Sequence, residues 1–147
     1  MSTNEVRVSI YRGFIDKGRA PMPAEIAAQL DLQIDKVMEA LEELHDADVI
    51  ALAPGTHNVW LAHPFSALDA PFKVSSAAEQ AWDAICIWDA LGILGLLEAD
   101  GSVATACPDC GEGLEIDVRD GEIAATNVGV VHYGVPANRW YEDVGFT

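Results

Sequence analysis

Basic residues are scarce in this chain. Its 147 residues include 8 Lys and Arg against 24 Asp and Glu, which gives a formal net charge of −16 at pH 7. Proteins bind nucleic-acid backbones and anionic membrane surfaces mainly through Lys and Arg, so this balance argues against both kinds of partner. The same balance suits a soluble protein, or one with cationic ligands.

Long uncharged apolar runs and a cysteine framework are also missing. No run of about 18 apolar residues is free of charge, so we expect no membrane-spanning helix. The N-terminal stretch MSTNEVRVSIYRGF has no apolar core of the kind found in a signal peptide. Three cysteines are an odd number for a disulfide framework, so free or metal-binding thiols are expected. Together these features predict a cytoplasmic protein.

The first part of the chain has the pattern of three helices followed by a β-hairpin. We predict helices over residues 5–18, 22–32 and 33–50, and a hairpin that turns at Pro54–Gly55. The third helix places apolar residues at the spacing of one buried face, namely Ile34, Val37, Met38, Leu41 and Leu44. This order is that of a winged helix. However, the third helix carries six acidic residues and Lys36 alone as a base, so we expect packing or a homodimer contact rather than DNA binding.

The second part of the chain reads as one long helix and a small sheet. After a connector over residues 63–76, we predict a helix over 76–101 that starts at a capping box of Ser76 and Glu79. Three strands follow, within residues 102–135. The predicted fold class is therefore α+β, with a winged-helix-like helical lobe over 1–65. The lobe over 66–147 is a helix packed on a small, mostly antiparallel sheet.

Two polar residues interrupt the apolar stretch AICIWDALGIL. Cys86 and Asp89 are three residues apart, which places their side chains on one face of a helix. A buried cysteine is usually an inert, small apolar residue, but an aspartate in a buried helix is costly unless it is paired. The pair alone is compatible with a structural or a functional role.

The sequence CPDC, residues 107–110, has the spacing of a metal-binding or redox pair. A tetrahedral zinc site needs two further ligands, and Cys86 and His132 could complete a set with Cys107 and Cys110. A redox dithiol fits less well, because that motif should open a helix and here glycines continue a turn. The other histidines have the settings of ordinary surface or hairpin residues, namely His45, His57 and His63.

These residues, in AICIWDALGIL and SVATACPDCGEGLEIDV, resemble the organomercurial (alkylmercury) lyases. The resemblance extends over nearly the whole chain and is specific in the spacing of Cys86, Asp89 and Cys107. It implies an N-terminal winged-helix-like lobe that does not bind DNA, and protonolysis of carbon–mercury bonds. Cys86 would be the attacking thiolate, Asp89 the proton donor, and Cys107 a structural cysteine near the site.

One departure marks the chain as a short or divergent member. The family has a later metal-binding cysteine before a His–aromatic pair, and here NVGVVHYGV has Val and Gly at that place, ahead of His132–Tyr133. Cys110 could supply a replacement thiol. Three hypotheses follow: an organomercurial lyase, a non-catalytic protein that binds zinc, copper or mercury through Cys86, Cys107 and Cys110, and a module in which CPDC only clips a turn. No organic cofactor is expected.

Overall fold

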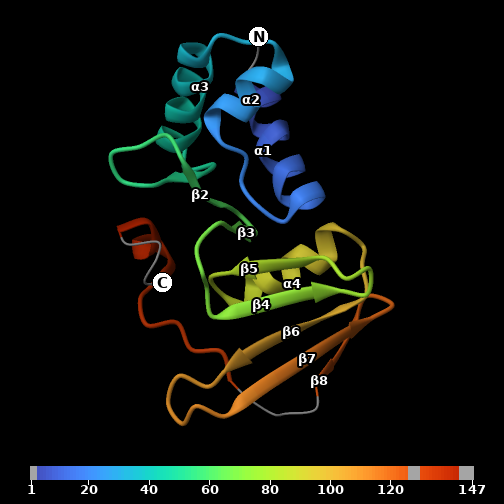
Figure 1. Cartoon of the computed structure of the whole chain (residues 1–147). Coiled ribbons are helices and arrows are strands. Elements are labelled where there is room, and N and C mark those ends of the chain that lie inside the picture. Colours follow the sequence, from blue (N-terminus) through green and yellow to red (C-terminus); the bar gives the residue numbers. More distant parts are fainter. Residues whose placement is uncertain (1–2, 126–129, 143–147) are drawn as a thin grey trace. The chain divides into compact units, whose positions relative to one another are not determined.

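The computed structural model describes residues 3–125 and 130–142 (Figure 1). Contacts within the chain divide it into two compact units, Met1–Asp69 and Ala70–Thr147. The sequence analysis placed the boundary after residue 65. Among the described helices, none has both the length and the apolar character that crossing a membrane would require.

The first unit contains three helices and two strands in the order expected from the sequence, followed by a third short strand that was assigned to the connector (Figure 1). Its elements are α1 (Thr3–Lys17), α2 (Pro23–Leu30), α3 (Ile34–Asp46), β1 (Ala51–Leu52), β2 (Val59–Ala62) and β3 (Phe65–Ser66). The strands pair antiparallel, β1 with β2 and β2 with β3. The order of elements agrees with a winged helix, which stays a prediction.

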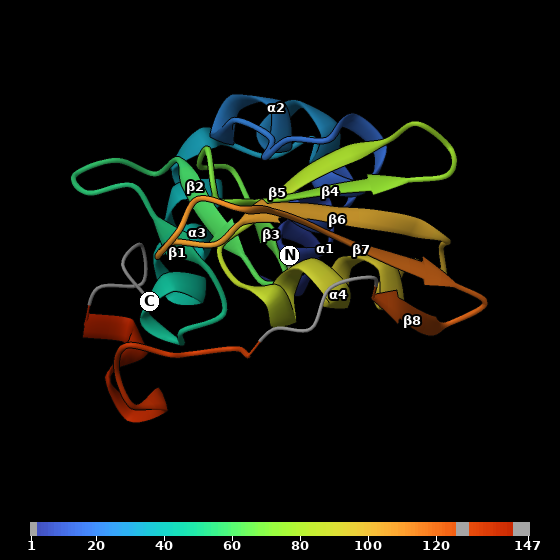
Figure 2. The same ribbon diagram turned by 90° about the horizontal axis from the view of Figure 1, so that it is seen from below.

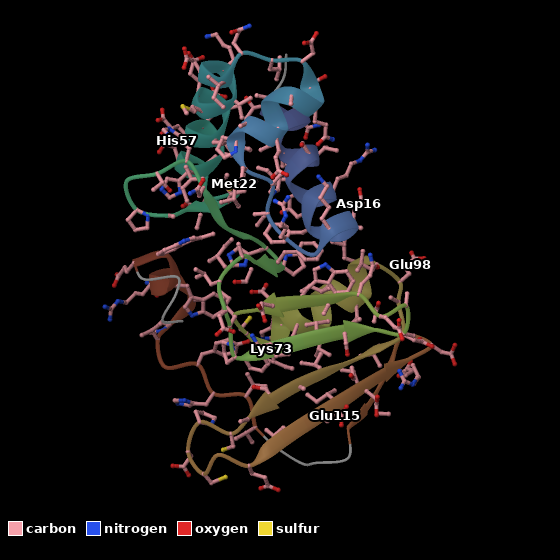
Figure 3. All side chains as sticks on the ribbon, in the orientation of Figure 1. Asp16, Met22, His57, Lys73, Glu98 and Glu115 are labelled. Atoms are coloured by element: carbon pink, nitrogen blue, oxygen red, sulfur yellow. The ribbon has the colours of Figure 1, made fainter. Side chains whose placement is uncertain are left out.

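Helical periodicity accounts for the core of this unit. Val37, Leu41 and Leu44 of α3 are buried, whereas its acidic residues face solvent. Phe14 of α1 stacks on Phe65 with ring centroids 5.3 Å apart. On the surface, His57 lies in the loop between β1 and β2 and its Nε2 is 2.8 Å from a Glu42 carboxylate oxygen (Figure 3). The first lobe is thus a helical core with an acidic exterior.

The second unit is one helix on an antiparallel sheet. Its elements are β4 (Phe72–Ser76), β5 (Ala81–Ala84), α4 (Ile87–Leu96), β6 (Gly101–Ala106), β7 (Gly113–Arg119), β8 (Glu122–Ala125) and the 3-10 helix η1 (Ala137–Glu142). The strand order is β5-β4-β6-β7-β8, and every neighbouring pair is antiparallel. Helix α4 packs on β4, β5 and β6 and covers one face of the sheet (Figure 2). The α+β class predicted from the sequence is confirmed.

The prediction of one helix over residues 76–101 was wrong. Its first half is the turn and second strand of the hairpin β4–β5, and the helix begins only at Ile87. Burial in β5 alternates: Trp82 and Ala84 are buried, whereas Ala81 is exposed and Asp83 is half-buried. That period of two is the mark of a strand with one covered face.

The expected capping box at Ser76 and Glu79 is a hairpin turn instead. The Glu79 N–H donates to the Ser76 carbonyl oxygen at 3.0 Å, and Glu79 has a left-handed φ of 62°. The Ser76 hydroxyl accepts from the Gln80 N–H at 3.3 Å, a bond that resembles a helix cap but here closes a turn. The connector expected over residues 63–76 likewise contains strands β3 and β4.

Candidate functional site

Cys86 lies at the point where strand β5 gives way to helix α4. It is the N-cap of the helix, with φ −144° and ψ 169°, and its Sγ accepts a hydrogen bond from the Asp89 N–H at 3.4 Å. The two residues are therefore close together, as the sequence predicted. The expected geometry was wrong, because they are the N-cap and third residue of the helix rather than neighbours on a mid-helix face.

The surroundings of Cys86 favour a protonated thiol. Burial raises the pKa of Cys86, and the charge of Asp89 and a side-chain hydrogen bond with Asp89 raise it further. The backbone N–H groups of Asp89 and Trp88 act in the opposite direction and lower this pKa, but the balance is upward. Beside this half-buried pair, Trp88 leaves 68% of its surface exposed. The start of α4 thus holds a thiol with its proton, a carboxyl group and an exposed aromatic ring.

The charges of Cys86 and Asp89 also act on Tyr133. Burial raises the pKa of Tyr133 first, followed by the charges of Cys86 and Asp89, so its hydroxyl lies within their electrostatic reach. Its ring packs against that of Trp140, with centroids 5.2 Å apart. The indole Nε1 of Trp140 in turn donates to the Val135 carbonyl oxygen at 3.0 Å. Sequence reasoning used Tyr133 only as a landmark, since nothing local links it to Cys86.

Cys107 and Cys110 lie together in the turn between β6 and β7. The Gly111 N–H donates to the Cys107 carbonyl oxygen at 2.9 Å, and the Cys107 N–H donates to that of Glu112 at 2.8 Å. The N–H groups of Cys110 and Asp109, together with the Cys110 thiol, lower the pKa of Cys107. This pair therefore contains a thiol whose pKa is lowered, in contrast to Cys86.

Cys86 and Cys107 follow two strands that are separated by one strand of the sheet. Strands β5 and β6 lie on either side of β4 and both run antiparallel to it, so both cysteines lie at the same end of the sheet. Strands two positions apart are separated by about 10 Å. Over residues 3–125 and 130–142, no three His, Cys, Asp or Glu side chains form a group that could hold a metal ion. The predicted set of Cys86, Cys107, Cys110 and His132 is thus not assembled in advance.

Comparison with known proteins identifies the family. Residues 65–147, which are more than half of the chain, match the model of MerB, alkylmercury lyase. The chain belongs to the alkylmercury lyase family. The matched region contains the residues of the site at the start of α4 and the CPDC turn.

A solved structure shares the fold of this family member. The crystal structure of the mercury-bound form of MerB2 superposes with a TM-score of 0.65 at 20% sequence identity. The match covers 84% of this chain and 59% of that chain, so the present chain spans less than two thirds of the solved protein. At this identity the likeness concerns the fold. The search of curated proteins gives no match.

Proposed function

We propose that this member of the alkylmercury lyase family cleaves carbon–mercury bonds by protonolysis, with Cys86 and Asp89 as its catalytic residues. The observation that carries the proposal is the closeness of Cys86 and Asp89 at the start of α4: the Asp89 N–H donates to the Cys86 sulfur at 3.4 Å. Burial, and a side-chain hydrogen bond with Asp89, raise the pKa of this half-buried thiol. A thiol sulfur is a soft ligand suited to mercury, and a neighbouring carboxyl group can carry a proton to carbon.

The proposed reaction balances without a cofactor. As the Cys86 sulfur bonds the mercury of an R–Hg–thiolate adduct, its thiol proton passes to the Asp89 carboxylate. Asp89 then delivers that proton to the carbon, and the electron pair of the carbon–mercury bond forms the new carbon–hydrogen bond. The hydrocarbon leaves, and mercury(II) remains between the Cys86 sulfur and the external thiolate. The raised pKa of Cys86 suits this sequence, because the thiol must bring a proton as well as a sulfur.

The CPDC turn is the best candidate to supply a second protein sulfur to mercury. Cys107 has the lowered pKa, and Cys110 lies beside it, so the pair offers two sulfurs to a soft metal. Because this turn is about two strand spacings from Cys86, we propose that it takes part after cleavage by accepting mercury(II), rather than during proton transfer. His132, which is exposed, stays a candidate ligand for the same step.

The release of hydrocarbon tests the proposal directly. The full chain is incubated with phenylmercuric acetate and excess thiol, and benzene is measured by gas chromatography. Turnover is expected in the wild type, none in Cys86→Ser, and at least about a hundredfold less in Asp89→Asn, which keeps the backbone N–H and side-chain shape. Asp117→Asn is the matched control, because Asp117 only pairs with Arg119 on the exposed face of β7. Full activity of Asp89→Asn would refute the assigned proton donor.

A non-catalytic metal-binding function is the second candidate, favoured by the closeness of Cys107 and Cys110. It predicts stoichiometric mercury binding without benzene. Purified protein that carries about one equivalent of zinc, lost in the Cys107→Ser/Cys110→Ser variant, would identify zinc as the bound metal.

A further inference from the structure

The Tyr133 hydroxyl is a buried oxygen without a hydrogen-bond partner among the residues that the structure describes. An unpaired buried hydroxyl destabilises a folded protein, and native structures keep few of them. Two contacts nevertheless hold the segment in place: the Tyr133 ring packs on Trp140, and Trp140 is bonded to the Val135 carbonyl. A side chain that is fixed by packing and left without a polar partner is typical of a binding site whose ligand supplies, or rearranges, the missing partner.

After burial, the charges of Cys86 and Asp89 act on this hydroxyl among the residues that the structure describes. Both raise the pKa of Tyr133, so the hydroxyl keeps its proton and can serve as a donor to either group. Once mercury binds the Cys86 sulfur, it takes up the sulfur's charge and electron pair. Of these two groups, the Asp89 carboxylate is then the stronger acceptor for the hydroxyl.

We infer that Tyr133 is a positioning residue of this site, whose hydroxyl donates a hydrogen bond to the Asp89 carboxylate after mercury has bound Cys86. During cleavage, negative charge develops on Asp89 as its proton moves to carbon, and a donor fixed beside it stabilises that charge. The kinetic part of this inference rests on the proposed lyase function. The hydrogen bond itself requires only mercury on Cys86 and an ionised Asp89.

Carbon-13 NMR of the tyrosine ζ carbon detects the hydrogen bond without turnover. The chain has three tyrosines, so their signals are assigned with Tyr133→Phe. In the Cys107→Ser/Cys110→Ser background, one equivalent of mercury(II) with excess thiol is added, and mass spectrometry confirms its place on Cys86. The Tyr133 signal is expected to shift, and the shift is expected to vanish in Asp89→Ala. A Tyr133 signal that stays in place with mercury on Cys86, or that shifts equally in Asp89→Ala, would overturn the inference.

Steady-state kinetics test the role in cleavage. Tyr133→Phe is expected to lower kcat for benzene release by about 10- to 100-fold and to change KM by less than about twofold, since the bond forms as charge develops. Its melting temperature should not fall, because the hydroxyl that is removed has no partner in the described structure. Tyr11→Phe is the matched control. The Tyr11 hydroxyl donates to the His63 carbonyl at 2.9 Å, so its loss should lower the melting temperature and leave kcat unchanged.

The two failures can be told apart. A wild type that releases no benzene refutes the proposed function, and the NMR shift then decides on the hydrogen bond alone. An active wild type with an unchanged kcat in Tyr133→Phe refutes the kinetic role of Tyr133 and leaves the lyase function standing.

Discussion

Replacing Gly101 by alanine tests how α4 is seated on the sheet. Gly101 begins β6, where it pairs with Ser76 on one side and Val118 on the other. A Cβ at this position would lie well inside van der Waals contact with the Ser75 carbonyl oxygen, and 2.7 Å from Cδ2 of Leu94. The first neighbour is backbone in a paired strand. The second is a fully buried side chain of the helix that carries the site. Neither neighbour can yield without moving a whole element.

The expected cost follows from these two contacts. Inserting a methyl group into a packed core costs about 1–3 kcal/mol, and a clash with backbone belongs at the upper end of that range. The entropy that alanine removes from the unfolded chain returns about 0.4–1 kcal/mol. We therefore expect Gly101→Ala to lower the free energy of unfolding by about 2 kcal/mol. Because Leu94 is displaced, α4 should shift as well and benzene release should fall.

Urea unfolding followed by tryptophan fluorescence measures the effect, with Gly113→Ala as control. Gly113 belongs to the same β6–β7 ladder, but a Cβ there meets nothing within 4 Å. The control should be as stable as the wild type, or more stable by up to about 1 kcal/mol. A free energy of unfolding of Gly101→Ala within about 0.5 kcal/mol of the wild-type value would contradict the close packing of α4 against β4 and β6.

Two further predictions concern titrating groups. Near neutral pH, iodoacetamide should modify Cys107 before Cys86, because neighbouring N–H groups lower the pKa of Cys107 whereas burial raises the pKa of Cys86. Peptide mass spectrometry measures both rates of modification, and equal rates would contradict the two environments. The Arg19 side chain and the Met22 N–H lower the pKa of Glu25 to about 2, so this contact stabilises the fold above pH 4.5 and is lost as the pH falls toward 2. Glu25→Gln should therefore melt below the wild type at pH 7 and together with it near pH 2, and a pH-independent difference would count against the contact.

Local patterns were sufficient to predict the three helices of the first unit, although not its strand β3. Helix α3 is long and strongly periodic. Three residues of its predicted buried face, Val37, Leu41 and Leu44, are buried, whereas Met38 is half-buried and Ile34, at the first residue of the helix, is exposed. Gly18 ends α1 with a φ of 67°, a conformation that glycine adopts without strain. The positions of these helices follow from their own residues, so periodicity and a single glycine were enough to predict them.

The stretch from Ser76 to Gly101 shows why the second unit was harder to predict. Its apolar residues are so dense that helix and strand periods both fit, and Ser76 with Glu79 resembles a helix start. What decides in favour of a strand is pairing with β4, whose residues were assigned to a connector. Because β4 was not recognised as a strand, nothing indicated that the residues after it return as its hairpin partner. Tyr133 was missed for another reason: it is far from Cys86 in the sequence, so no local pattern links the two residues.

Cys86 lies at the N-cap of α4 rather than in the middle of a helix, and this position changes the chemistry that Cys86 and Asp89 can perform. In mid-helix the backbone N–H groups are used within the helix, whereas at its start those of Trp88 and Asp89 point to the Cys86 sulfur. Burial raises the pKa of this thiol, and in the proposed protonolysis these N–H groups would support the sulfur once its proton had moved to Asp89. Cys107 has the donors without the burial, and its pKa is lowered. Of the two environments, that of Cys86 better fits the proposed protonolysis, which needs a proton as well as a sulfur.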